Sequence, residues 1–165
     1  MELREVMQKR KSIRQYLATP VEKEKIKAMI EAAILAPTWK NAQEIRYYVA
    51  VSEEKRQAVL DALVEGNRKK TQNAPVFLIS AVILNRAGFQ KDGSADNELG
   101  NGWGCYDLGL QNENLILKAT DLGLSTLIMG LREADRLREI LNIPETETIV
   151  SVIAIGKAAE EPIRP

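Results

Sequence analysis

Four polar residues near the start of the chain are of types that bind anions: Arg10, Lys11, Ser12 and Arg14. Two arginines four positions apart can lie on one face of a helix, where their planar guanidinium groups bind phosphate oxygens in pairs. The Ser12 hydroxyl would add a short donor to the same group. The cluster therefore predicts a site for a ligand with a phosphate dianion, and the competing interpretation is a charged, solvated helix end.

The chain of 165 residues contains no histidine and a single cysteine, Cys105. These counts exclude Ser-His-Asp and Cys-His catalysis, histidine metal ligation, thiolate zinc sites and intramolecular disulfides. Cys105 stands in an apolar stretch, which predicts a packed structural thiol rather than a nucleophile. An enzyme with this composition must take its chemistry from a bound cofactor or from carboxylates, and we expect no metal site.

Positive and negative residues balance, with 23 Lys plus Arg and 23 Asp plus Glu. A net charge of zero gives no electrostatic reason to expect a nucleic acid or a membrane as partner. The longest apolar stretch, residues 75–84, is too short to span a bilayer, and the charged start of the chain does not resemble a signal peptide. Together with the lone thiol, these features predict a cytoplasmic protein.

The elements that must position the basic cluster begin with two helices. Apolar residues at helical spacing predict the first over residues 2–9. Thr19 as N-cap, Pro20 in the first turn and Glu22 in a capping box predict where the second begins. The second helix ends before Pro37, and its apolar stripe comprises Ile26, Met29, Ile30, Ala33 and Ile34.

The rest of the chain mixes strands and helices. Ser52 caps a third helix that extends to residue 70, and a helix apolar nearly all round runs to its stop at Gly123. Residues 85–102 form a mobile loop. The order predicts one α+β domain over residues 1–165, with a mixed central sheet flanked by helices. The expected strands are residues 46–51, 75–84, 125–129 and 148–155, and the later helices are 103–122 and 132–141.

Several motifs, in the right order, resemble those of the nitroreductase family, whose members depend on flavin mononucleotide (FMN). Residues 10–16 (RKSIRQY) resemble the opening signature of the family, and residues 36–43 (APTWKNAQ) resemble its second motif. Later matches are Ala74-Pro75 before an apolar strand, Asp107-Leu108-Gly109 in the long helix, and Gly156 before Glu160-Glu161-Pro162. The resemblance covers essentially the whole chain and implies a nitroreductase-like fold in a homodimer.

The resemblance also implies which residues hold FMN. Arg10 and Ser12 are expected on the phosphate and ribityl side, and Arg14 near the pyrimidine edge of the ring. The loop of residues 37–41 is expected to border the flavin of the partner subunit. No side chain is expected to be catalytic, because the flavin carries the chemistry. The expected cofactor-binding residues are Arg10, Lys11, Ser12, Arg14, Pro37, Thr38, Trp39, Asn41, Asn67, Lys70, Ile128, Met129, Gly130 and Arg164.

Two segments depart from the family pattern. Gln43-Glu44-Ile45 stands where the family usually has Gln-Pro-Trp, and without the proline the loop is less fixed in φ. Met129-Gly130 stands where Glu-Gly is common, but the expected contact is a backbone N–H, which tolerates any side chain. For Lys70 the competing interpretation is the ordinary placement of positive charge at a helix end. For Trp39 it is a core tryptophan.

The implied function is an oxidoreductase that transfers hydride from NADH or NADPH through FMN to a nitroaromatic, quinone or related conjugated acceptor in a ping-pong cycle. A cation near the pyrimidine edge would stabilise the negative charge of the reduced ring. Residues 85–102 are the candidate for a loop that shapes the substrate site. Two alternatives stay open: a family relative that dehydrogenates or dehalogenates a specific metabolite, and a non-catalytic dimeric protein that binds flavin.

Overall fold

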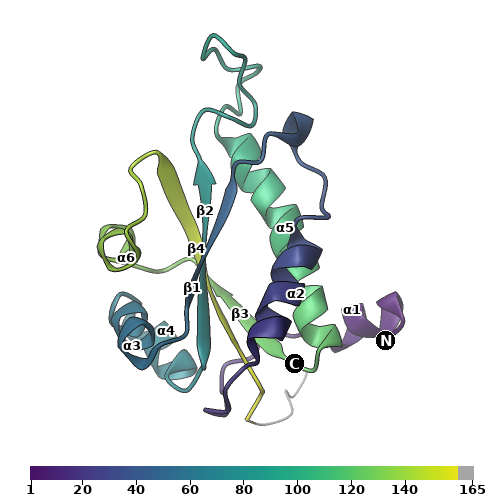
Figure 1. Cartoon of the computed structure of the whole chain (residues 1–165), viewed down its shortest axis with the longest axis vertical. Coiled ribbons are helices and arrows are strands. Elements are labelled where there is room, and N and C mark those ends of the chain that lie inside the picture. The colour runs from purple at the N-terminus through teal and green to yellow at the C-terminus, as the bar shows by residue number, and fades with distance from the viewer. Residues whose placement is uncertain (160–165) are drawn as a thin grey trace.

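The computed structural model describes residues 1–159 and has one sheet between two layers of helices (Figure 1). The strand order is β1-β2-β4-β3, and every pairing between these strands is antiparallel. The sheet is therefore antiparallel and not mixed as predicted; a parallel pairing between Ser12 and Thr126, at the β3 edge, is an isolated bridge outside the strands. The strands are β1 (Ile45–Ala50), β2 (Val76–Ile83), β3 (Ser125–Met129) and β4 (Glu147–Gly156).

Alternating side chains of the strands divide the core into two layers. In β2, Phe77 and Ile79 belong to one buried cluster, and Leu78 between them belongs to the other. This alternation places one helical group on each face and confirms the predicted α+β class (Figure 1). The first face carries α3 (Glu53–Asp61), α4 (Glu65–Thr71) and α6 (Ala134–Leu141), and the second carries α2 (Lys23–Ala33), α5 (Gly102–Asp121) and, packed on α5, α1 (Leu3–Lys9).

Local capping signals account for some helix ends. The Ser52 hydroxyl accepts the Lys55 amide at 3.3 Å at the start of α3. Gly123, with φ of 73°, follows α5. The predicted start at Thr19 is wrong, because α2 begins at Lys23 with Glu22 as its N-cap. Main-chain pairing with the end of β4 holds the preceding segment extended, since the Leu17 amide donates to the Lys157 carbonyl at 3.0 Å.

Three further expectations are corrected. The third helix is broken into α3 and α4, because Leu63 between them bridges to Arg132. Ile34 is exposed, since α2 ends at Ala33 and Ile34 is its C-cap. Cys105 is exposed rather than packed, because it lies on the outer face of α5. Its neighbour Gly104 faces the sheet, where an added Cβ would lie 3.5 Å from Val82.

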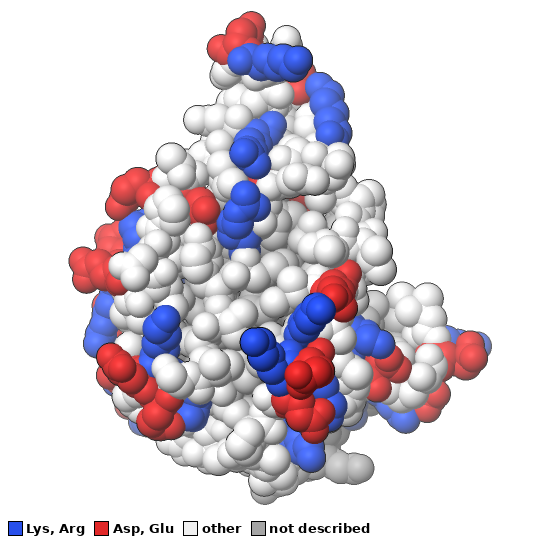
Figure 2. Space-filling model, in the orientation of Figure 1, with Lys and Arg blue, Asp and Glu red and all other residues white. Residues whose placement is uncertain are grey.

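Charge is dispersed over the surface. Figure 2 shows lysine, arginine and acidic residues mixed over the visible face, without a broad field of one sign. Several charged pairs are one helical turn apart, such as Lys9 with Glu5 at 2.8 Å and Lys27 with Glu31 at 3.6 Å. Within residues 1–159, no helix has the length and apolar character needed to cross a membrane.

Candidate functional site

The segment that follows α1 runs along the free edge of β3. Arg10 is the C-cap of α1, and the chain then extends so that the Ile13 amide donates to the Thr126 carbonyl at 3.0 Å. The prediction that Arg10 and Arg14 share one helix face is therefore wrong. The unpaired backbone groups of an edge strand take up the hydrogen bonds that a continued helix would have made internally.

Some side chains of this segment are buried in the core, and others are exposed and can donate hydrogen bonds to a ligand. Ile13 and Tyr16 are buried, and the Tyr16 hydroxyl donates to the Ile13 carbonyl at 2.9 Å. Ser12 and Arg14 are exposed, and Arg14 Nη1 donates to the Ser12 carbonyl at 3.2 Å. Lys11, directly before Ser12, is partly buried. The segment thus presents a hydroxyl and a guanidinium along the strand edge while its buried side chains fix it to the core.

The end of β3 adds an apolar surface beside these donors. Ile128 is 44% exposed and Leu131 is 67% exposed, whereas Met129 between them is buried in the core. An added Cβ on Gly130 would meet no atom within 4 Å. The Ser12–Thr126 bridge is isolated, and by Tyr16 the chain pairs with Ala158, beyond the end of β4, so only the start of the segment lies along β3. The cationic segment and the exposed side chain of Ile128 therefore belong to neighbouring chain segments at one edge of the sheet, and an added Cβ at Gly130 would meet open space.

Helix α4 reaches the same region. Asn67 Nδ2 donates to the Leu131 carbonyl at 3.4 Å, which ties the helix to the segment after β3. Lys69 is paired with Glu65 one turn earlier. Lys70 is exposed and forms no ion pair in the described part of the chain. The structure therefore brings Asn67 to the segment after β3, and Lys70 lies on the same short helix, one turn further along.

We call this group of residues the β3-edge site; it comprises Arg10, Lys11, Ser12, Arg14, Asn67, Lys70, Ile128, Met129 and Gly130. Among residues 1–159, neither Arg10 nor Arg14 has a carboxylate partner. Guanidinium groups and a hydroxyl suit a phosphate and a polyol, and exposed aliphatic side chains suit the plane of a ring. The donor set fits the expected FMN. Arg164, the remaining expected cation, lies outside the described residues.

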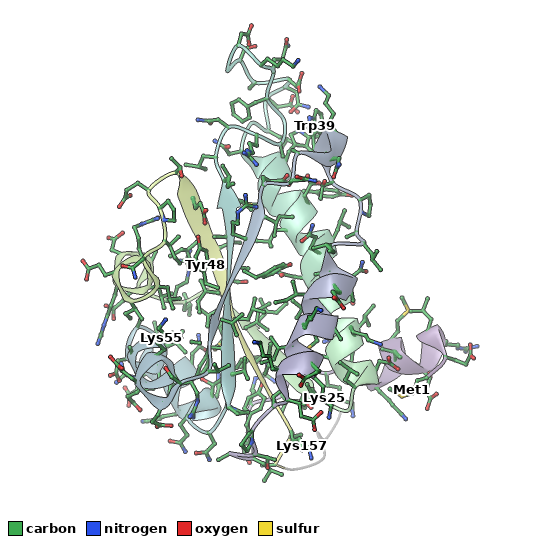
Figure 3. All side chains as sticks on the ribbon, in the orientation of Figure 1. Met1, Lys25, Trp39, Tyr48, Lys55 and Lys157 are labelled. Carbon is green, nitrogen blue, oxygen red and sulfur yellow. The ribbon has the colours of Figure 1, made fainter. Side chains whose placement is uncertain are left out.

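The other expected residues lie elsewhere. Pro37, Thr38, Trp39 and Asn41 precede β1, at the sheet edge opposite β3, and Trp39 and Asn41 bound the short 3-10 helix η1 (Trp39–Asn41). Figure 3 shows Trp39 beside the upper end of α5, with Lys157 at the other end of the molecule. One chain therefore does not bring these four residues to the β3-edge site.

Trp39 is held on α5 by two contacts. Its amide donates to Asp107 Oδ2 at 2.7 Å, and its ring centroid lies 4.5 Å from that of Trp103. The ring is partly buried, so Trp39 is neither a fully enclosed core residue nor a free one. The residues 38–43 thus form a loop fixed against the start of α5.

Sequence reasoning missed the buried carboxyls behind this loop. Glu44 was noted only as a departure from the family pattern, yet its side chain is fully buried beside Asp107. The pKa of Glu44 is raised to about 7, mainly by burial and also by the adjacent Asp107 carboxyl, whereas its own amide and Arg86 oppose the shift. A glutamate directly before an apolar strand, where relatives have proline, was the signal that could have identified it.

Comparisons with known proteins agree with this architecture. The chain is 28% identical to an FMN reductase (NAD(P)H) of Bacillus subtilis, over 91% of this chain and 63% of that protein. It is also 28% identical to an NADPH-flavin oxidoreductase of Vibrio harveyi, over 92% of this chain and 64% of that one. The chain thus spans slightly less than two thirds of the length of these two relatives.

The fold has a similar counterpart of known structure. A nitroreductase family protein from Clostridium novyi superposes with a TM-score of 0.84 at 23% identity, covering 100% of this chain and 89% of that one. The sequence profile of the Nitroreductase family matches residues 7–157, a span that contains every element from α2 to β4. The chain therefore belongs to the nitroreductase family.

Proposed function

We propose that the protein is an FMN-dependent oxidoreductase that uses NAD(P)H to reduce a nitroaromatic, quinone or related conjugated acceptor. The observation that carries the proposal is the β3-edge site, where Arg10 and Arg14 form no ion pair with any residue of 1–159 and the segment that holds them bridges to β3, the strand of the exposed Ile128. The names of the Bacillus subtilis and Vibrio harveyi relatives support a flavin and a reduced nicotinamide as cofactor and donor.

Different residues of the β3-edge site would contact different parts of the FMN molecule. Arg10 and Ser12 would bind the phosphate and ribityl chain through charged and neutral hydrogen bonds. Arg14 would lie near the pyrimidine edge, where its positive charge favours the reduced form. Asn67 and Lys70 would contact the ring, and the backbone of residues 128–130 would pass beside it.

When bound, FMN supplies the redox chemistry by accepting hydride from the nicotinamide and giving electrons to the acceptor. The protein contributes position and electrostatics, which suits a chain without histidine. We propose that donor and acceptor occupy the same space in turn, because the exposed side chains of Ile128 and Leu131 offer one apolar surface that either could share. Steady-state rates at several fixed acceptor concentrations would then give parallel double-reciprocal lines.

We further propose that two chains complete each site. Within one chain the loop of residues 38–43 and the β3-edge site lie at opposite edges of the sheet. Large apolar residues are exposed on α1, on α5 and after α2, a pattern that suits a partner chain. These residues are Leu3, Met7, Ile34, Leu35 and Tyr106. A dimer with two flavins would have the doubled mass in sedimentation analysis, and a stable monomer with bound flavin would contradict this part.

Reduced nicotinamide as the donor and a single exposed thiol suit action in the cytoplasm.

The projecting segment of residues 85–101 touches the loop of residues 38–43, since Lys40 pairs with Asp96 at 3.1 Å. We therefore keep this segment as the candidate for shaping the acceptor site.

The deciding experiment is the visible spectrum of the purified protein, followed by an NADH or NADPH oxidation assay with a nitroaromatic. We expect flavin absorption bands, release of FMN on denaturation, and turnover that requires both donor and acceptor. Bound flavin without nicotinamide oxidation would support the alternative of a relative with another reaction. A colourless protein that does not bind added FMN would overturn the proposal.

A further inference from the structure

Two carboxyl groups face each other behind the loop of residues 38–43. Glu44 precedes β1 and is 0% exposed, and Asp107 on α5 is 3% exposed. The Glu44 backbone is fixed, because the Ile83 amide donates to its carbonyl at 2.8 Å. The two carboxyls are close enough for one to donate a hydrogen bond to the other. Neither residue can move its charge into water without disturbing the packing around it.

The nearby cations do not neutralise this pair. Arg46 on β1 donates through Nη1 to the carbonyls of Gln43 and Ile45, at 3.0 and 2.8 Å. Arg86, after β2, donates to the Gln43 carbonyl at 3.2 Å. The Arg46 guanidinium therefore binds carbonyls on both sides of Glu44, and the Arg86 guanidinium binds the carbonyl before it. The positive charge of Arg86 lowers the pKa of Glu44, but this effect is smaller than the rise that burial causes. Lys40 is already paired with Asp96.

Hydrogen-bond acceptors outnumber donors here. Glu44 Oε1 and Oε2 and Gln111 Oε1 are buried, and no protein donor of normal geometry reaches them in residues 1–159. The Trp39 indole Nε1 is buried nearby but has no acceptor, so it does not serve these oxygens. Unpaired carboxylate oxygens in a buried site are costly. A proton held between the two carboxyls removes one charge and supplies the missing donor.

The loop that depends on Asp107 is locally strained. Lys40, Asn41 and Gln43 have φ values of 47°, 53° and 53°, in the left-handed region that residues with a side chain seldom adopt. Such a backbone persists only where its surroundings hold it. The amide of Trp39 bonds to Asp107 Oδ2, so the same carboxylate contacts both the loop and Glu44.

We propose that Glu44 and Asp107 share one proton, and that this proton holds the loop of residues 38–43 in place against α5. With the proton present, Glu44 donates to Asp107 while Asp107 accepts the Trp39 amide. With it lost, two like charges face each other in a dry site, and the strained loop moves away. A cavity of about 340 Å³ is lined by Thr38, Asn41 and Gln43 of this loop together with Arg46 and Gln111, so the loop borders open space into which it can move.

The consequence for the enzyme rests on the proposed function, in which this loop borders the flavin of the partner subunit. Glu44 and Asp107 would then be positioning residues that make flavin binding depend on pH. Because both side chains are buried, their effect would pass through the backbone of Trp39, whose amide donates to Asp107.

The tryptophans give a direct probe. The chain has two, Trp39 and Trp103, and their rings contact each other beside the carboxyl pair. We expect the emission of the purified protein to change once between pH 5.5 and 9, with a midpoint near pH 7 set by the raised pKa of Glu44. Glu44→Gln should abolish this change, because the glutamine amide donates to Asp107 at every pH.

Glu147→Gln is the matched control. Glu147 is also a buried glutamate, but the Tyr48 hydroxyl donates to its Oε2 at 2.7 Å, so its carboxylate has the donor that Glu44 lacks. This variant should keep the transition. Asp107→Asn should also remove it and serves as the second variant if Glu44→Gln does not fold. An unchanged transition in either variant of the pair, or no transition in the natural protein, would overturn the proposal.

FMN titrations at pH 6 and 8.5 test the consequence separately. The phosphate of FMN itself titrates at about pH 6, so the two proteins are compared: the ratio of FMN affinity at pH 8.5 to that at pH 6 should be about fivefold lower in the natural protein than in Glu44→Gln. If no FMN binds at any pH, the proposed function fails, while the fluorescence result still tests the shared proton. An equal ratio in the two proteins would contradict the link between the pair and the flavin site.

Discussion

The two polar regions of this molecule have opposite electrostatic designs. Within residues 1–159, the β3-edge site holds the partly buried Arg10 and the exposed Arg14 without acidic partners, whereas the region behind the other edge buries Glu44 and Asp107 without an ion pair. An exposed cation is solvated by water and costs the fold little until a ligand replaces that water. A buried carboxylate is not solvated by water, so it must be protonated or accept hydrogen bonds from protein donors. We therefore expect charge at the first region to serve binding and charge at the second to govern conformation.

The comparison predicts that substitutions at the two regions separate affinity from stability. Arg10→Ala should weaken FMN binding by about 1.5–3 kcal/mol, on the order of 10- to 150-fold, because charged hydrogen bonds to phosphate are lost. The free energy of unfolding without FMN should change by less than about 0.5 kcal/mol. Flavin fluorescence titration and urea denaturation measure the two quantities.

Arg4→Ala is the control for this change. Arg4 is an exposed arginine on α1, six residues from Arg10, and forms no ion pair within the described chain. Its removal subtracts the same charge and should leave FMN affinity within about twofold, since screening weakens charges away from the ligand. Equal losses in both variants would mean that Arg10 acts only through net charge and does not touch the phosphate.

At the buried pair the expected effect is on stability and depends on pH. Because the folded pKa of Glu44 is raised from 4.5 to about 7, its contribution to stability is full below pH 4.5 and is lost as the pH rises to 7. Glu44→Gln should therefore be more stable than the natural protein at pH 9, by on the order of 2 kcal/mol. At pH 4 the difference should vanish. Chemical denaturation at both values measures it, and a gain of equal size at pH 4 would assign the effect to packing.

The smallest expected effect concerns the open space at Gly130. Its backbone does not require glycine, and an added Cβ meets no protein atom, so Gly130→Ala should leave unfolding within about 0.5 kcal/mol. FMN affinity should fall by about 1 kcal/mol, roughly fivefold, if the ring lies over this residue. Gly156→Ala is the contrasting variant, because its Cβ would lie 2.6 Å from Pro75 Cδ. That variant should lose about 1–3 kcal/mol of stability. Unaltered FMN affinity in Gly130→Ala would remove the residue from the site.

The sequence predicted most elements because their signals are local. Strands β1, β2, β3 and β4 match runs of β-branched and aromatic residues within a few positions, and Ser52 and Gly123 mark the helix ends they were expected to mark. The expected motif residues fall into two spatial groups at opposite edges of the sheet, and a site shared between subunits stays a prediction. The predictions that failed involve chain segments whose partners are distant in sequence. Thr19 does not cap α2, because pairing with β4 holds the chain before it extended.

Local periodicity and motif order thus determined the α+β class, the strands and the identity of the cationic residues, since each depends on neighbours a few positions away. Tertiary structure decided how those residues face one another. It turned Arg10 to Arg14 from a supposed helix face into an extended segment on β3, and it exposed Cys105. It also brought Glu44 against Asp107, which is 63 positions along the chain. Burial and proximity set the protonation of that pair, and neither quantity is encoded in the residues around either carboxyl.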